Sequence, residues 1–379
     1  MEEKMKRILF LVPKIYGGGI EKALLDIIRN LDQNKYEISV IYLLGEGIEY
    51  LPLVEKYANV KIIFKKSNKK LINIFQMGVR WALNSLPPVL QWKIIVNKQY
   101  DVEIAYAHGL TTRIISGSKN KSKKYAWIHN DISDMKLTYF PVTEKMMHNS
   151  YKKYNAVCAV SEAAGKAFEK RYQLSSLIQP NVVDLSDIIE KSEAYKSKKA
   201  SEFTIVSVGR LEKIKGFDRL LRVHKRLIDE GIENTVCIIG EGTQRHELQA
   251  YIDENDLTQT AKLLGFQENP YPCVKSADLF VCSSLHEGIS LALCEAIVLD
   301  VPVVTTRVCG SIELFGDSEY GVVVDNDEEA LYCGIKEMVT RAETYQYYKQ
   351  KIRERKQLFD KEQIVRKFEK LIEDFDDEE

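Results

Sequence analysis

Short apolar runs alternate with helical patterns along the whole chain, and this alternation most limits the possible fold. Strands that alternate with helices favour parallel β-sheets built from βα units. In the first half, the predicted strands lie at residues 7–12, 36–44, 59–64, 101–107, 125–128 and 156–160. In the second half, they lie at residues 203–208, 235–240, 261–265, 278–283, 302–306 and 320–325. Predicted helices include residues 20–31, 161–172, 290–299, 342–358 and 361–375. The predicted fold class is therefore α/β.

The chain has 379 residues, too many for one ordinary hydrophobic core, so the sequence predicts two domains. Two Rossmann-like domains are expected, at residues 1–180 and 181–379. Residues 179–184 are expected to link them, and the polar run 189–201 is expected to form an exposed loop. The amphipathic C-terminal helix, at about 361–379, is a candidate to pack back on the first domain.

The cysteines and the apolar runs indicate a cytoplasmic protein. Seven cysteines are present, an odd number with no C-x-x-C pair, which is typical of reduced core cysteines. The apolar run at residues 8–12 is too short for a signal sequence and is followed by Pro13. The charge-free window at 81–92 is far shorter than the roughly 20 residues that span a bilayer. We therefore expect neither secretion nor a membrane-spanning helix.

Two glutamates, Glu287 and Glu295, stand eight residues apart where a buried strand passes into a helix. Gly288, Ile289 and Ser290 form the predicted turn, and a helix that starts there offers free N–H groups to an anion. Separated carboxylates beside an anion site favour hydroxyl-rich ligands such as ribose and sugar, because ionised carboxylates only accept hydrogen bonds. The alternative is that Glu287 only caps the helix and Glu295 is solvated.

Two further loops follow predicted strands, where ligands bind in open parallel sheets. Gly17, Gly18 and Gly19 follow the first strand and allow a backbone to approach a ligand closely. The alternative is that the three glycines form a simple flexible turn. In the second domain, Gly209 is followed by Arg210 and Lys215. A guanidinium and an ammonium at one strand end suit a diphosphate. The alternative is that Arg210 and Lys215 are simply two surface cations.

His129 follows the predicted strand at residues 125–128. Most single histidines in such places are structural or surface residues. Its position beyond a strand end nevertheless makes it a candidate for a site between the domains, and Asp131 is close enough in sequence to be its partner. No spacing typical of metal ligands is present, so we predict neither a metal nor another cofactor.

Several of these motifs occur in a specific order. They are Gly17-Gly18-Gly19-Ile20-Glu21, QPNVVD at residues 179–184, Gly209-Arg210 with Lys215-Gly216, Gly240-Glu241-Gly242, Leu264-Gly265-Phe266, and Glu287-x7-Glu295. In this order the chain resembles the retaining glycosyltransferases of family 4, which have the GT-B architecture of two facing Rossmann-like domains. The resemblance covers nearly the whole chain.

The resemblance implies transfer of a sugar, with retention, from a nucleotide-diphosphate donor to an acceptor hydroxyl. UDP is the more frequent nucleotide in such enzymes, and GDP stays open. The second domain would hold the donor and the first domain the acceptor. Arg210 and Lys215 would neutralise the diphosphate together with the N–H groups of Ile289, Ser290 and Leu291. Glu295 would bind the ribose, and Glu287 would hold hydroxyls of the donor sugar.

The remaining implied contacts lie around the donor. Gly265 and Phe266 would lie near the base, the loop at Gly17 to Gly19 would close over the diphosphate, and His129 would stabilise the reacting sugar. The other glycines of the predicted donor site are Gly209, Gly240 and Gly288. No metal is needed in this scheme, because two cations and a helix start can stabilise the leaving diphosphate.

The first half of the chain is basic. Residues 1–180 carry a net charge of +12 and residues 181–379 a net charge of −13. In the segment 64–98, basic residues are interleaved with aromatic ones: Lys65, Lys66, Lys69, Lys70, Arg80, Lys93 and Lys98 with Phe75, Trp81 and Trp92. This composition fits peripheral binding to an anionic membrane, and it equally fits a helix with a solvated basic face. We hypothesise a lipid-linked acceptor, as in the assembly of surface polysaccharide.

Three other functions compete with this hypothesis. A protein of the same fold that has lost catalysis could serve as a partner subunit of another transferase, but the intact acidic and basic set argues against it. A nucleotide-sugar epimerase would convert the donor without an acceptor. A nicotinamide-dependent oxidoreductase is disfavoured, because no G-x-G-x-x-G follows a strand. Nucleic acid is not an expected partner, since no binding motif accompanies the basic segment.

Overall fold

The computed structural model describes residues 5–15, 19–45, 51–65, 70–133, 135, 142–195 and 203–373. The chain divides into two compact units. Unit 1 comprises Met1–Val182 and Glu362–Glu379, and unit 2 comprises Val183–Lys361. Each unit contains one sheet, and every strand pair for which a register is defined is parallel.

Unit 1 has a seven-stranded sheet in the order β3-β2-β1-β4-β5-β6-β7. The strands are β1 (Lys6–Ile15), β2 (Tyr36–Gly45), β3 (Asn59–Lys65), β4 (Val102–Ala105), β5 (Lys123–Ile128), β6 (Ala156–Ala159) and β7 (Leu177–Ile178). The helices are α1 (Gly19–Asn30), α2 (Leu51–Val54), α3 (Lys70–Ser85), α4 (Pro88–Ile95), α5 (Leu110–Ile115), α6 (Glu144–Tyr151), α7 (Glu162–Tyr172) and α16 (Lys361–Glu373). The order reverses at β1 and β4, as in a doubly wound sheet.

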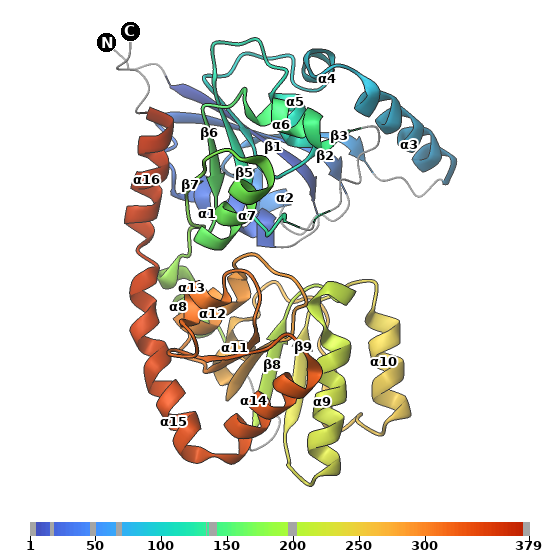
Figure 1. Cartoon of the computed structure of the whole chain (residues 1–379), viewed down its shortest axis with the longest axis vertical. Helices are drawn as coiled ribbons and strands as arrows, with labels where there is room; N and C mark the ends of the chain where they lie inside the picture. The colour runs from blue at the N-terminus through green and yellow to red at the C-terminus, as the bar shows by residue number, and fades with distance from the viewer. Residues whose placement is uncertain are drawn as a thin grey trace. The chain divides into compact units, whose positions relative to one another are not determined.

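Helix α16 belongs to unit 1 although it ends the described chain (Figure 1). Its Phe368 is fully buried and lies against Phe10 of β1 and Trp127 of β5, with ring centroids 6.3 and 5.7 Å apart. The hydroxyl of Tyr125 donates to the carbonyl of Leu371 at 2.6 Å. The helix therefore closes one face of the sheet with aromatic packing that local sequence does not supply.

Unit 2 has a six-stranded sheet in the order β10-β9-β8-β11-β12-β13. The strands are β8 (Thr204–Val208), β9 (Thr235–Ile239), β10 (Ala261–Leu263), β11 (Leu279–Cys282), β12 (Val303–Thr306) and β13 (Val322–Val324). The α-helices are α8 (Leu185–Ser192), α9 (Phe217–Asp229), α10 (Arg245–Glu254), α11 (Tyr271–Ser276), α12 (Leu291–Val298), α13 (Ser311–Phe315), α14 (Glu328–Thr340) and α15 (Ala342–Lys351). Two 3-10 segments are η1 (Lys213–Lys215) and η2 (Ile352–Leu358).

Helices α9 and α14 pack together on one face of this sheet (Figure 1). Leu220, Leu221 and Leu227 of α9 and Leu331 and Ile335 of α14 are completely buried in one apolar cluster with the strands. Outside this core, Arg222 of α9 pairs with Glu328 at the start of α14 at 2.8 Å. Apolar residues at helical spacing thus decide which side of each helix meets the sheet.

The sequence predictions for the strands are confirmed, since all twelve overlap observed strands. The two-residue strand β7 was not predicted. The expected exposed loop at 189–201 is wrong at its start, because Asp184 caps α8, whose Ile188 is buried, and the helix continues to Ser192. Residues 196–202 and the expected helix end beyond Glu373 lie outside the described residues. The helix predicted at 342–358 changes to a 3-10 segment at Ile352.

Within the described ranges, no helix has both the length and the apolar character needed to span a bilayer.

Candidate functional site

The carboxyl ends of β8 and β11 lie side by side in unit 2, because these strands are neighbours at the point where the strand order reverses. Such a switch point separates the loops that follow two adjacent strands and leaves a crevice for ligands. The loop after β8 leads through η1 to α9, and the loop after β11 leads to α12. The predicted donor-site residues of both loops therefore meet at one edge of the sheet.

Lys215 and Glu287 form an ion pair between these two loops. The ammonium Nζ of Lys215 lies 2.8 Å from Oε1 and 2.6 Å from Oε2 of Glu287. The two side chains are only 20% and 15% exposed. The sequence placed both residues at this edge but did not predict that they pair. Arg210 is half-buried in the same loop as Lys215, one residue after Gly209.

The start of helix α12 supplies backbone donors at the same edge. Ser290 is its N-cap residue, and its side chain makes no capping hydrogen bond within the described structure. The first N–H groups of a helix have no partner inside the helix, so the segment from Ile289 to Leu291 is suited to an anion. Glu295 lies one turn further along α12, is 6% exposed, and accepts a hydrogen bond from the Tyr271 hydroxyl at 3.3 Å.

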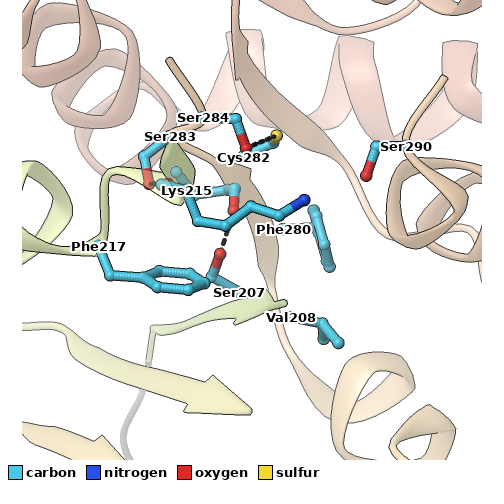
Figure 2. A pocket seen from close by; sticks show the side chains of 10 residues that line it. Ser207, Val208, Lys215, Phe217, Phe280, Cys282, Ser283, Ser284 and Ser290 are labelled. Atoms are coloured by element: carbon cyan, nitrogen blue, oxygen red, sulfur yellow. Dashed lines mark hydrogen bonds between the residues drawn. The ribbon is translucent and has the colours of Figure 1, made fainter. Parts of the chain in front are cut away.

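A small pocket of about 10 Å³ lies beside Lys215, with room for about one water molecule. Figure 2 shows the Lys215 side chain extended across this pocket, with Phe217 and Ser207 on one side and Ser290 on the other. The Ser283 hydroxyl donates to the carbonyl of Lys215 at 2.9 Å. The pocket walls are thus mainly hydroxyl groups and aromatic rings around one cation.

Three glycines with positive φ allow the loops of unit 2 to touch through their backbones. A Cβ at Gly216 would lie 2.2 Å from the carbonyl oxygen of Ser283, and one at Gly240 would lie 1.9 Å from that of Gly209. A Cβ at Gly310 would lie 2.9 Å from the carbonyl oxygen of Gly288. These separations are too short for any side chain, so glycine is required at each point.

The predicted base-binding residues follow β10. Gly265 has φ +74°, and its carbonyl accepts a hydrogen bond from the N–H of Gly240 at 2.8 Å. Phe266 is 44% exposed. Glu241 and Arg245 form an ion pair at 2.7 Å next to Gly265. An exposed ring and a polar pair therefore lie at the edge of this strand.

In unit 1, His129 follows β5 and is 8% exposed. Its ring meets that of Tyr106 edge-on, with centroids 4.7 Å apart, and burial lowers its pKa to about 4, opposed by a hydrogen bond with the Tyr106 backbone. Its buried Nε2 has no hydrogen-bond partner among the residues that the structure describes. The Asp131 carboxylate accepts from Ser133 instead, with N–H to oxygen at 2.8 Å.

The glycine loop after β1 is described only at its end. Gly17 and Gly18 lie outside the described residues, and Gly19 begins helix α1. Sequence reasoning missed His108, which follows β4 and therefore carries the same signal as His129. The His108 Nδ1 lies 2.6 Å from the Tyr151 hydroxyl, and burial lowers its pKa to about 4. Tyr271, the partner of Glu295, lies in a short helix that no sequence pattern indicated.

The match to a known protein family lies within unit 2. Residues 188–355 match the sequence model of the family described as "Glycosyl transferases group 1". The N-acetylgalactosamine-N,N'-diacetylbacillosaminyl-diphospho-undecaprenol 4-alpha-N-acetylgalactosaminyltransferase of Campylobacter jejuni is 36% identical over 188 residues, which are 49% of this chain and 50% of that protein. The first curated relatives are each matched over about half of their length.

Two longer similarities cover both units. An uncharacterized glycosyltransferase of Haemophilus influenzae is 21% identical over 97% of this chain and 100% of its own. The solved structure of Anabaena Alr3699/HepE in complex with UDP and glucose has a TM-score of 0.72 at 17% identity, covering 98% of this chain and 100% of that one. At this identity the structural likeness concerns the fold alone. The predicted fold class, GT-B with two parallel-sheet α/β units, is confirmed.

We expect Gly310→Ala to lower the free energy of unfolding by roughly 1–3 kcal/mol more than Gly231→Ala does, as is usual for overpacking. Both glycines have positive φ, at +82° and +74°. Only at Gly310 would the new methyl group meet backbone, whereas a Cβ at Gly231 meets nothing within 4 Å. Urea denaturation of both variants measures the difference. Equal destabilisation would show that the close approach at Gly288 does not constrain the loop.

Burial of neutral His129 should make stability depend on pH. The pKa is 6.5 in the unfolded chain and about 4 in the folded one, so the unfolded state binds more protons between these values. The contribution of neutral His129 to the free energy of unfolding is fully present above pH 6.5. It is lost as the pH falls, and the loss is roughly 3 kcal/mol at pH 4. His129→Gln should therefore lose less stability than the parent between pH 6.5 and 4. Substitution of the exposed His246 by Gln serves as the control, and parallel pH profiles for parent and His129→Gln would contradict the assignment.

Proposed function

We propose that the chain is a retaining glycosyltransferase that moves a sugar from a nucleotide-diphosphate sugar, with UDP as the first candidate nucleotide, to an acceptor hydroxyl. The observation that carries the proposal is the half-buried pair of Lys215 and Glu287 beside the uncapped start of α12, at the switch point of a parallel sheet. A cation, a carboxylate and free N–H groups together suit a ligand that contains both phosphate and hydroxyl groups. The family match over residues 188–355 supports it.

In this proposal unit 2 binds the donor. Lys215 and Arg210 contact the diphosphate, which also receives the N–H groups of residues 289–291. Glu295, held by the Tyr271 hydroxyl, accepts hydrogen bonds from the ribose. The base lies against Phe266 near Gly265, where the exposed ring provides a stacking surface. Gly209, Gly240 and Gly288 allow the backbones of neighbouring loops to lie close to one another, and this leaves room for the nucleotide beside them.

The proposed reaction breaks the bond between the anomeric carbon and the phosphate oxygen and forms a bond from that carbon to the acceptor oxygen on the same face. The acceptor proton passes to the departing phosphate oxygen, so the products are the glycoside and the nucleoside diphosphate. Arg210, Lys215 and the start of α12 stabilise the negative charge that develops on the leaving group. Glu287 holds sugar hydroxyls, and His129 supports the sugar as it gains positive charge.

A neutral His129 suits this role. Its pKa of about 4 keeps the imidazole uncharged at neutral pH, so it does not repel a sugar with oxocarbenium character. The buried Nε2, without a partner among the described residues, remains available for a ligand hydroxyl. The Gly17–Gly19 loop, of which only Gly19 is described, is proposed to close over the donor and exclude water.

We further propose a lipid-linked glycan acceptor and peripheral binding to the inner face of the cell membrane. The Campylobacter jejuni relative is named for a substrate carried on diphospho-undecaprenol. In this chain, residues 56–100 contain nine Lys and Arg and no Asp or Glu. Helices α3 and α4, within that segment, expose large apolar side chains: Ile72, Met77, Trp81, Leu90 and Ile94. Basic residues around exposed apolar ones favour an anionic lipid surface.

The structure corrects one part of the sequence expectation for this segment. Trp92 was expected among the aromatic residues at the interface, but it is 8% exposed and donates from Nε1 to the buried Glu103 at 2.9 Å. Trp92 therefore anchors α4 to unit 1. Lys66 and Lys69 lie outside the described residues, as do the side chains of Lys70 and Phe75.

The first test is nucleotide release from a panel of UDP- and GDP-sugars, with and without a membrane lipid extract. Release from one donor should rise with the extract. Glu287→Gln should lower it by more than about a hundredfold, while UDP binds at least about threefold tighter, because removal of the carboxylate frees Lys215 for the diphosphate. Lys215→Ala should lower nucleotide release and weaken UDP binding. Lys213 lies in the same turn but is exposed, so Lys213→Ala should change neither nucleotide release nor UDP binding.

Other outcomes of this panel would replace the proposal. Binding without release from any donor favours a non-catalytic partner subunit, and conversion of a donor sugar without acceptor favours an epimerase. Weaker UDP binding to Glu287→Gln would contradict the proposed competition between the carboxylate and the diphosphate for Lys215.

The membrane proposal predicts flotation of the chain with anionic vesicles. Replacing Met77, Trp81 and Ile94 together by Ser should lower the vesicle-bound fraction at least about tenfold, and replacing Lys65, Lys66, Lys69 and Lys70 by Gln should do the same. A control replaces Ile189, Tyr347 and Leu358, which are exposed apolar residues of unit 2, by Ser. Failure to float, or equal loss in the control, would favour a soluble acceptor.

A further inference from the structure

Three consecutive carbonyl groups of the loop that follows β11, residues 283–285, each accept a hydrogen bond from a side chain of a different element. Arg219 of α9 donates to the Ser283 carbonyl at 2.5 Å. Thr306, the last residue of β12, donates to the Ser284 carbonyl at 2.7 Å. Asn326, which follows β13, donates to the Leu285 carbonyl at 2.8 Å. We call residues 283–285 the clamped loop.

The clamped loop is also tied to the turn that contains Lys215. The N–H of Leu285 donates to the Ile214 carbonyl at 2.7 Å, and the Ser283 hydroxyl donates to the Lys215 carbonyl at 2.9 Å. Gly216 lies so close to Ser283 that no side chain fits between them. The turn η1, which contains Lys215, is therefore joined directly to the clamped loop, and Glu287 follows two residues after that loop.

Arg219 shows that this arrangement is costly for the fold. The side chain is 8% exposed, and burial lowers the pKa of its guanidinium. Its hydrogen bonds go to the carbonyl of Ser283 and to the carbonyl and side-chain oxygens of Asn326, at 3.2 and 3.0 Å for the latter two. Moving a charge out of water is unfavourable unless its hydrogen bonds are satisfied. Hydrogen bonds to neutral oxygens stabilise a buried guanidinium less than hydrogen bonds to a carboxylate do. What the buried cation fixes is the path of the clamped loop.

We propose that Thr306, Arg219 and Asn326 are positioning residues that set where Glu287, two residues beyond the clamped loop, stands relative to the reacting sugar. The inference rests on the proposed function. In the proposed function the nucleotide is bound by Arg210, Lys215, the start of α12, Glu295 and the segment around Phe266, whereas Glu287 holds hydroxyls of the sugar. A displaced Glu287 therefore affects the step in which the sugar changes charge and shape more than it affects nucleotide binding.

Adjacent threonines of β12 provide a matched test. Thr305 and Thr306 are both fully buried, but the Thr305 hydroxyl donates to the Thr306 carbonyl within the same strand at 3.1 Å. Valine has nearly the same shape as threonine and lacks the hydroxyl. Thr306→Val should lower kcat for nucleotide release about tenfold and change the Kd for UDP less than about twofold. Thr305→Val should change both less than about twofold, and Thr306→Ser, which keeps the hydroxyl, should retain the parent kcat.

Asn326→Ala tests the clamp at an exposed residue, and it also removes the side-chain oxygen that accepts a hydrogen bond from Arg219. It should lower kcat with little change in Kd, whereas Asn255→Ala, which removes a similar amide-to-carbonyl hydrogen bond at the end of α10, should not. Equal kcat values for the two valine variants and for the two asparagine variants would overturn the proposal. A loss of UDP affinity as large as the loss of kcat would also overturn it. If the parent chain releases no nucleotide from any donor, the proposed function fails instead.

Discussion

The ion pair between Lys215 and Glu287 is the interaction on which the candidate site depends. Each residue lies in a loop after a different strand, and the two loops meet only because β8 and β11 are neighbours at the reversal of the strand order. A cation and a carboxylate held this close in a half-buried place compensate each other until a ligand enters. We propose that a diphosphate competes with Glu287 for the ammonium, and that a sugar hydroxyl offers the carboxylate a new donor. In the proposed function, the pair is a preformed site for the two chemical parts of a nucleotide sugar.

Backbone contacts hold this pair in place. Gly216, Gly240 and Gly310 let the loops after neighbouring strands of the sheet touch where a side chain would collide, and three side chains bind the carbonyls of residues 283–285. Most of these contacts link elements that are far apart in sequence. The candidate site is consequently supported by the sheet of unit 2, whose strands and helices fix the positions of its loops.

Much of the fold could be predicted because its signals are local. Apolar runs that end in glycine or polar residues marked all twelve predicted strands, but β7 has only two residues, too few for a pattern. Helix α8 was missed because its residues are mostly polar, although Asp184 is a typical cap. The edge position of Arg210, Lys215 and Glu287 could be predicted, whereas the pairing of Lys215 with Glu287 could not. Likewise, Trp92 looks interfacial in sequence, and only its buried partner Glu103, brought by the fold, shows otherwise.

Hydrogen–deuterium exchange of the full chain with and without UDP tests most directly where the donor binds. The account predicts slower exchange of the amides at residues 209–216 and 288–291 when UDP is present, because these loops surround the diphosphate. The loop at 264–266 should be protected as well, through contact with the base. Protection confined to unit 1, or unchanged exchange in all three segments at saturating UDP, would contradict the assignment of the donor site to the Lys215 and Glu287 edge.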